Sequence, residues 1–248
     1  MRLKLIIAYD GRPFFGWQSQ TGGQTVQDYL ETALAKICGT RIVLHGSGRT
    51  DAGVHALAQC AHADTEHSRL KPAAWVLALN AHLPREIRVL KCTEAKPGFH
   101  ARFDAKGKIY TYRIWNHPVH SPFEQGRSWH LPGPLDLAQL TASAAQLTGT
   151  HDYAAFAANR GKREDDTVRT VHRIDLSKRG SLITLTFEGN GFLYKMVRLM
   201  TGTLIRCAQH RDEPDWIPDL LDRKKKTSFA APAEGLYLTR VLYPKTGR

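Results

Sequence analysis

The stretch Gly46-Ser47-Gly48-Arg49-Thr50-Asp51-Ala52-Gly53-Val54-His55-Ala56 decides how the rest of this sequence is interpreted. Its three glycines permit tight turns and let other groups approach the main chain closely. The run before it, Arg41 to His45, is mostly β-branched and apolar, and the run after it, Leu57 to Asp64, alternates bulky and small residues. Both flanks are therefore predicted strands. Asp51 is expected on the loop between them, a common position for a functional group.

Two other interpretations of this loop are open from the residues alone. In an ordinary connecting loop, Thr50 and Asp51 would bond to nearby amides while the glycines turn the chain. A phosphate-binding loop fits less well, because the stretch has neither a G-x-x-x-x-G-K-S/T nor a G-x-G-x-x-G pattern, and no helix follows it.

Composition favours a polyanionic partner. The chain has 248 residues, and Lys plus Arg exceed Asp plus Glu by 35 − 23 = 12. Basic proteins bind nucleic acids by neutralising phosphates and releasing counterions. No apolar run approaches the ~20 residues of a membrane helix, and Met1 to Lys4 leads directly into a strand pattern rather than a signal peptide. We expect no membrane association, a cytoplasmic location and reduced thiols at the four scattered cysteines.

The first part of the chain shows a β-α-β-β-α-β pattern. Residues 2–9 alternate as a strand, with Leu3, Leu5, Ile7 and Tyr9 on one face. A helix follows Thr25, which has capping-box spacing with Asp28, and this helix ends at Gly39. After the two strands around Asp51, a helix begins at Pro72 and a strand covers residues 87–92.

The same order recurs in the second part. A strand is predicted over 108–116, a helix over 137–147, a hairpin from strands 168–176 and 181–188, a helix over 192–207 and a strand over 236–243. A short extra helix is predicted near 215–221, followed by the basic run 223–226. This order predicts an α+β protein with two ferredoxin-like (βαββαβ) lobes, 1–105 and 106–248, and a cleft between them. The link 96–107 is too aromatic to be a free linker.

The sequence lacks the residue patterns of serine-nucleophile and metal-dependent enzymes. No serine lies in a G-x-S-x-G elbow and no Cys/His cluster has metal-ligand spacing, so we expect no metal. A loop carboxylate with cationic support remains, which suits covalent or electrostatic catalysis at a glycosidic carbon.

The run Gly48-Arg49-Thr50-Asp51-Ala52-Gly53-Val54-His55-Ala56 resembles the active-site signature of the TruA-type tRNA pseudouridine synthases. The stretches 9–18, 99–105, 191–198 and 233–238 are similar to other motifs of that family. Ser47 and Ala58 depart from it, since alanine and glycine are usual there. The resemblance covers nearly the whole chain.

This resemblance implies a pseudouridine synthase fold with a central, mainly antiparallel sheet. It implies conversion of uridine to pseudouridine at positions 38, 39 and 40 in the anticodon stem-loop of tRNA. No cofactor is expected, because the isomerisation needs neither redox change nor a group donor. Family members act as homodimers, so we expect a homodimer here.

The resemblance also assigns residues. Asp51 is the catalytic aspartate, and Arg198 of the 191–198 motif is expected to pair with it. Tyr110 corresponds to the active-site tyrosine, which would stack on a flipped uracil. Arg49 would fill the vacated space or hold a phosphate, and Lys195 is a further expected substrate-binding residue.

Each assignment has a plainer alternative. Tyr110 and Tyr112 share one face of a strand and could both be core residues. Lys195, Arg198, Gly202 and Arg206 form a helical stripe that would ordinarily face water, as would the basic run 223–226. The rival for the whole chain is a non-catalytic RNA-binding protein with tandem ferredoxin-like modules, but its K/R-G-F/Y-G/A-F-V strand is absent from the sequence. A nucleotide-dependent enzyme would need the missing phosphate loop.

Overall fold

The computed structural model describes residues 1–66, 70–158, 166–212, 216–227 and 229–244. The chain divides into two compact units, Met1–Lys106 with Tyr237–Arg248, and Gly107–Leu236. The first boundary lies one residue from the expected division between residues 105 and 106. Residues 237–248, which that division assigns to the C-terminal lobe, group with the first unit.

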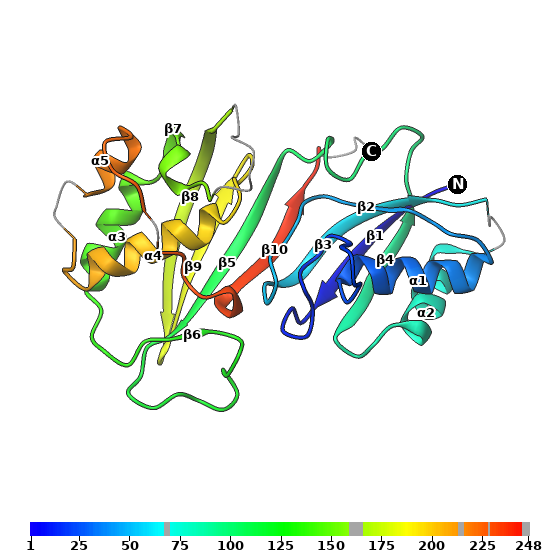
Figure 1. Ribbon diagram of the computed structural model, residues 1–248, viewed down its shortest axis with the longest axis horizontal. Coiled ribbons are helices and arrows are strands. Elements are labelled where there is room, and N and C mark those ends of the chain that lie inside the picture. The colour runs from blue at the N-terminus through cyan, green and yellow to red at the C-terminus, as the bar shows by residue number, and fades with distance from the viewer. Residues whose placement is uncertain (67–69, 159–165, 213–215, 228, 245–248) are drawn as a thin grey trace. The chain divides into compact units, whose positions relative to one another are not determined.

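The first unit is a sheet with two helices (Figure 1). In chain order its elements are β1 (Arg2–Tyr9), α1 (Val26–Cys38), β2 (Leu44–Gly46), β3 (His55–Asp64), α2 (Pro72–His82), β4 (Ile87–Glu94) and β10 (Leu236–Leu242). Strand β1 pairs antiparallel with both β4 and β3. The other edge of β3 is shared, because β2 pairs antiparallel with residues 61–63 and β10 pairs parallel with residues 55–56.

Local sequence explains the helices of this unit. The Thr25 hydroxyl accepts a hydrogen bond from the Asp28 amide and the Asp28 carboxylate accepts one from the Thr25 amide, which confirms the expected capping box. Gly39 ends α1 with a left-handed φ of 72°. Pro72 starts α2, where its missing N–H costs nothing. Figure 1 shows both helices on one face of the sheet.

The two faces of the sheet differ in character. On β1, Leu3, Leu5 and Ile7 are fully buried, as the alternating pattern predicts. Lys4 points to the opposite face, where its ammonium lies 4.0 Å from the centre of the Tyr243 ring and 4.7 Å from that of Phe99. The link after β4 thus packs on the face away from the helices, and the Tyr243 hydroxyl donates to the carbonyl of Ala101. The aromatic link is ordered chain that completes the first unit.

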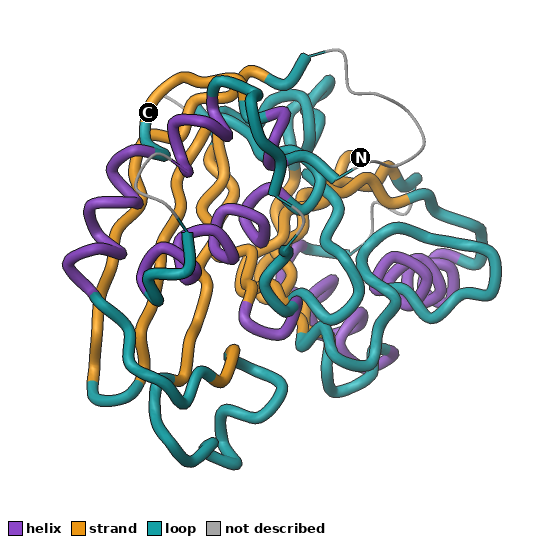
Figure 2. The backbone as a smooth tube through the Cα atoms, turned by 60° about the vertical axis from the view of Figure 1, so that its left-hand side comes forward, coloured by secondary structure: helices purple, strands orange, loops and turns teal. Residues whose placement is uncertain are grey.

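The second unit has its own mainly antiparallel sheet. Its elements are β5 (Gly107–Trp115), β6 (Trp129–His130), α3 (Leu137–Gln146), β7 (Gly149–Asp152), β8 (Val168–Arg179), β9 (Leu182–Gly189), α4 (Met196–Ala208) and α5 (Trp216–Leu221). The order β5-β9-β8-β7 is antiparallel throughout, and β6 pairs parallel with β5. The expected hairpin of β8 and β9 turns at Gly180, whose φ is 58°. Figures 1 and 2 show α3 and α4 on one face of this sheet.

Two short strands and the start of one helix in the second unit differ from what the sequence predicts. Strands β6 and β7 were not expected, because they hold only two and four residues. The helix expected to start at Phe192 starts at Met196, since Lys195 adopts a left-handed φ of 59°. The Phe192 ring packs edge-on against Tyr110 instead, with the ring centres 5.3 Å apart. Asp215, the expected start of the short helix, lies outside the described residues.

Candidate active site

Asp51 lies on the loop that joins β2 to β3. The Asp51 carbonyl accepts a hydrogen bond from the Val54 amide at 3.1 Å, which closes a tight turn through Gly53 at a φ of 77°. Ser47 and Thr50 of the same loop are buried, whereas Asp51 is half-buried. The loop therefore has a buried base, with Asp51 less buried than Ser47 and Thr50.

The N-terminal stretch 10–18 supports this loop at close range. A Cβ atom at Gly16 would lie 2.6 Å from the Thr50 carbonyl oxygen, and one at Gly11 would lie 2.1 Å from that of Val54. The Trp17 amide donates to the Thr50 carbonyl at 3.1 Å. Only glycine permits such contacts between two backbones, so the two motifs form one unit.

Three side-chain hydrogen bonds hold the loop from within the sheet. The Tyr9 and Thr50 hydroxyl oxygens are 2.8 Å apart. The Ser47 hydroxyl donates to Gln59 Oε1 at 2.6 Å, and Gln59 Nε2 donates to the Gly48 carbonyl at 2.9 Å. The serine that departs from the family's alanine thus has a partner, which alanine could not bond. Burial raises the pKa of Tyr9 far above its usual value, although its hydrogen bond with Thr50 opposes this.

His55, the histidine of the signature, is a buried packing residue. Its Nδ1 atom accepts a hydrogen bond from the Gly11 amide at 3.1 Å, and its ring stacks on Tyr237 with centres 4.5 Å apart. Asp10 lies beside it and forms a two-pronged contact with the Arg12 guanidinium. Burial raises the Asp10 pKa, but the hydrogen bonds from Arg12 outweigh it and hold that pKa below its usual value.

Arg49 is exposed and lies two residues before Asp51. Its Nε atom donates to Gln18 Oε1 at 3.1 Å, so the N-terminal stretch also orients this side chain. Asp51 and Arg49 are the two expected site residues in the first unit.

Tyr110, Lys195 and Arg198 belong to the second unit. Tyr112 is a core residue, fully buried with its hydroxyl bonded to the Pro232 carbonyl at 2.7 Å. Tyr110 is 8% exposed and borders the Phe192 ring. The two tyrosines of β5 therefore differ in surroundings, and Tyr110 contacts the segment that leads into α4.

Helix α4 carries Arg198, Gly202 and Arg206 of the expected stripe, which is covered at Arg198 and Gly202, whereas the Arg206 side chain is 40% exposed. Arg198 is half-buried, with its Nε atom donating to the Ala231 carbonyl at 2.7 Å, and Ala231 donates back to the Arg198 carbonyl. Gly202 lies under Phe229, because a Cβ atom there would be 2.2 Å from the Phe229 carbonyl oxygen. The segment around residues 229–231 thus covers the stripe at Arg198 and Gly202. Lys195 precedes the helix, with its ammonium 5.3 Å from the Tyr194 ring centre.

The basic run 223–226 is largely paired within its own unit. Arg223 forms an ion pair with Asp152, and Lys224 one with Asp222 at 2.9 Å. Lys225 contacts Asp219 at 3.0 Å, and this contact lowers the pKa of Asp219. The run therefore stabilises the region around α5.

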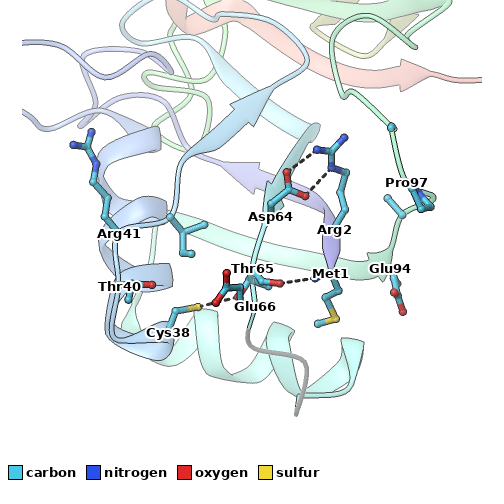
Figure 3. A pocket seen from close by; sticks show the side chains of 13 residues that line it. Met1, Arg2, Cys38, Thr40, Arg41, Asp64, Thr65, Glu66, Glu94 and Pro97 are labelled. Carbon is cyan, nitrogen blue, oxygen red and sulfur yellow. Dashed lines mark hydrogen bonds and ion pairs between the residues drawn. The ribbon is translucent and has the colours of Figure 1, made fainter.

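A polar pocket also opens in the first unit, away from the Asp51 loop. Its lining includes Arg2, Asp64 and Glu94 at the ends of β1, β3 and β4, and Arg41 between α1 and β2. Figure 3 shows Arg2 and Asp64 facing one another, and their paired hydrogen bonds measure 2.6 and 2.8 Å. The charges of Arg2 and Asp64 thus pair with each other in the pocket wall.

None of the His, Cys, Asp and Glu side chains described forms a group of three suited to a metal ion. Among the helices described, none is long and apolar enough to cross a membrane.

Comparison with known proteins identifies similar chains. Residues 5–104 and 143–244 match the family described as tRNA pseudouridine synthase. A "tRNA pseudouridine synthase A" of Akkermansia muciniphila is 45% identical over 253 residues, covering 98% of this chain and 96% of that protein. Proteins of the same name from Neisseria gonorrhoeae and Geotalea uraniireducens are each 41% identical; each match covers 98% of this chain, and 92% and 99% of those proteins respectively.

One solved structure is also similar, but weakly. A chain of a Cbf5–Nop10–Gar1 complex aligns with a TM-score of 0.37 and 12% identity, covering 95% of this chain and 48% of that one. A likeness of this size carries no weight for fold or function.

Proposed function

Because this chain belongs to the tRNA pseudouridine synthase family and is an isomerase of uridine in tRNA, we propose that it acts on uridines 38, 39 and 40 of the anticodon stem-loop. We also propose Asp51 as its catalytic carboxylate. The observation that carries the proposal is the glycine-rich loop 46–56, which holds a half-buried carboxylate on a base of buried hydrogen bonds.

The reaction breaks the N1–C1′ bond of uridine, turns the uracil and joins its C5 to C1′, after which the hydrogen at C5 leaves. A carboxylate can attack C1′ or C6, or stabilise cationic character on the ribose. Asp51 is half-buried, so part of the residue reaches the surface of the loop. The rigid support from Tyr9, Gly16 and Gln59 favours catalysis, since a positioned group loses little freedom when it reacts.

The uridine must leave its stack to reach Asp51, at a cost of about a few kcal/mol. We propose that Arg49 fills the vacated space or binds the neighbouring phosphate, because its exposed guanidinium is already oriented by Gln18. Tyr110 is proposed to stack on the uracil, with its ring, which is buried at 8% exposure, held edge-on by Phe192.

Arg198 is proposed as the cationic partner of Asp51. Its Nε bond to the Ala231 carbonyl fixes the guanidinium on α4, and a guanidinium supplies the positive charge that pairing with a carboxylate requires. Lys195, at the start of the same helix, is proposed to bind substrate.

At the level of the fold, we propose two ferredoxin-like lobes, 1–105 and 106–248, that share an inter-lobe cleft. The strand order β4-β1-β3-β2 of the first unit supports this assignment, since it is the order of a split βαβ arrangement. We further propose a homodimer that acts in the cytoplasm. The rival assignment, a non-catalytic RNA-binding protein, has no support from a family whose named members are synthases.

The position claim is tested with purified protein and unmodified tRNA transcripts that carry uridine at 38, 39 and 40. Pseudouridine is mapped along each whole transcript, and matched transcripts replace one of the three uridines with cytidine. We expect modification confined to the uridines remaining at 38–40. Modification elsewhere in the tRNA with none at these positions would reject the proposed target while leaving the isomerase activity intact.

A further inference from the structure

The turn 99–104, which follows β4, is held by an unusual set of hydrogen bonds. His100 Nδ1 accepts from the amides of Arg102 and Phe103 at 3.1 and 3.3 Å. The Asp104 carboxylate accepts from the His100 amide at 2.9 Å. The turn is therefore locked by its own side chains.

Contacts with the sheet fix the same turn from below. The Ala101 amide donates to Nδ1 of His62 on β3 at 3.1 Å, and the Ala101 carbonyl accepts from Tyr243. The Arg2 guanidinium donates to the Phe99 carbonyl at 2.7 Å. Ala101 is completely buried by these contacts.

This rigid turn points a large aromatic side chain into solvent. Phe103 is 73% exposed, and the neighbouring Arg102 is exposed as well. The His100 ring supports Phe103 from one side, with ring centres 4.2 Å apart. The turn thus presents an aromatic face and a guanidinium side by side. Because its backbone is already ordered, binding a ligand there would cost little further conformational entropy.

The turn lies far from the Asp51 loop along the same strand. His55 follows that loop at the start of β3, and His62, which holds the turn, is seven residues later. At ~3.3 Å per residue, this separation is roughly 23 Å. A ligand that contacts both places must be large, and the tRNA substrate is such a ligand.

We propose that Arg102 and Phe103 form a second tRNA contact, in which Phe103 stacks on an unpaired base and Arg102 binds an adjacent phosphate. Base stacking on aromatic side chains tolerates any base, and a nearby arginine adds charge attraction to the backbone. The net charge of +12 agrees with a polyanion as the occupant. The proposal rests on the action of the chain on tRNA, and it holds whichever uridine is modified.

The test measures tRNA affinity of the full chain and the steady-state constants kcat and KM for Phe103→Ala and Arg102→Gln. We expect Phe103→Ala to weaken tRNA binding by about 5- to 150-fold, the range of base–aromatic stacking, with kcat unchanged. Arg102→Gln is expected to lower the slope of log affinity against log salt by about 1. Phe103→Tyr should bind like the unchanged protein, because its ring also stacks.

Matched controls lie on the helix side of the same unit. Leu77 on α2 is 75% exposed, and Arg85 is an exposed arginine shortly after that helix. Leu77→Ala and Arg85→Gln should leave affinity and salt slope unchanged. The proposal is overturned if Phe103→Ala binds tRNA like Leu77→Ala, or if its effect is a change of oligomeric state by sedimentation, which would make this turn an interface between copies. Because the readout is total tRNA binding, an error about positions 38–40 would not affect it.

Discussion

The hydroxyl of Tyr9 lies 2.8 Å from the hydroxyl of Thr50, the residue directly before Asp51. Both side chains are buried, with Tyr9 4% and Thr50 7% exposed. A strand of the core thus fixes the backbone from which the carboxylate extends.

This contact predicts a catalytic effect for Tyr9→Phe, which removes one oxygen atom. The Thr50 hydroxyl loses its partner, and we expect kcat to fall about 10- to 100-fold because Asp51 is less well positioned, with KM for tRNA unchanged. Tyr29→Phe, on the half-exposed surface of α1, is the control and should keep full activity. A rise in KM at constant kcat would contradict a positioning role.

Gly16→Ala is expected to displace the Asp51 loop. The new methyl group would meet the Thr50 carbonyl at 2.6 Å, and the φ of 88° disfavours any residue but glycine. The matched control is Gly22→Ala, where φ is 104° but no atom lies within 4 Å. Backbone strain alone costs about 1–2 kcal/mol. Both variants should lose this much stability. We predict that only Gly16→Ala also loses activity, because only its methyl group meets the Asp51 loop. Equal activities of the two variants would show that the contact is unimportant.

The lowered pKa of His62 predicts that the protein loses stability in mild acid. Burial and the nearby His100 and His45 lower its pKa from 6.5 to about 4. The neutral ring is required because its Nδ1 atom accepts from Ala101. His62 therefore binds a proton more readily in the unfolded chain than in the folded one. Its contribution to the free energy of unfolding is complete above pH 6.5 and declines as the pH falls towards 4. The expected slope is up to about 1.4 kcal/mol of unfolding free energy per pH unit.

Urea unfolding between pH 7 and pH 4 measures that slope. His62→Asn keeps an acceptor oxygen but does not titrate, so the difference between the two proteins isolates His62 from the other histidines. We expect the variant to lose less stability in acid. Parallel stability curves for the two proteins would contradict the assignment.

Arg198→Leu is predicted to abolish most activity and to move the acidic limb of the pH–rate profile to higher pH. A carboxylate that loses a cationic neighbour ionises less readily. Arg198→Lys keeps the charge and should shift the profile less. If Arg198→Leu keeps the original profile, its loss of activity reflects only the broken bond to Ala231.

Much of this fold follows from local patterns in the sequence. The capping box at Thr25, the stop at Gly39 and the alternation of β1 depend on residues close together in the chain, and the structure confirms each. Parts that depend on distant residues were harder to predict. The short strand β7 forms only because residues 168–171 pair with it, and its own sequence, Gly-Thr-His-Asp, is poor in strand formers.

In the candidate site, too, features set by local sequence could be predicted, whereas those set by distant residues could not. The loop position of Asp51 follows from the strands on either side of it, and the structure agrees. The supporting contacts of Tyr9, Gly16 and Gln59 span between 11 and 41 residues of sequence, and no local pattern indicates them. For the α4 stripe, spacing left a water-facing surface as the plainer alternative. Phe229 and Ala231 cover it at Gly202 and Arg198, and spacing within a helix carries no information about what packs on it.

The central claim is that Asp51 is the group that carries out the isomerisation. Asp51→Asn keeps the size of the side chain and removes its charge, so the loop and the phosphate contacts should persist. The most direct measurement is tritium release from tRNA labelled at uridine C5, with tRNA affinity measured on the same preparations. We predict no release by Asp51→Asn and nearly unchanged affinity. Release at the rate of the unchanged protein would contradict the claim.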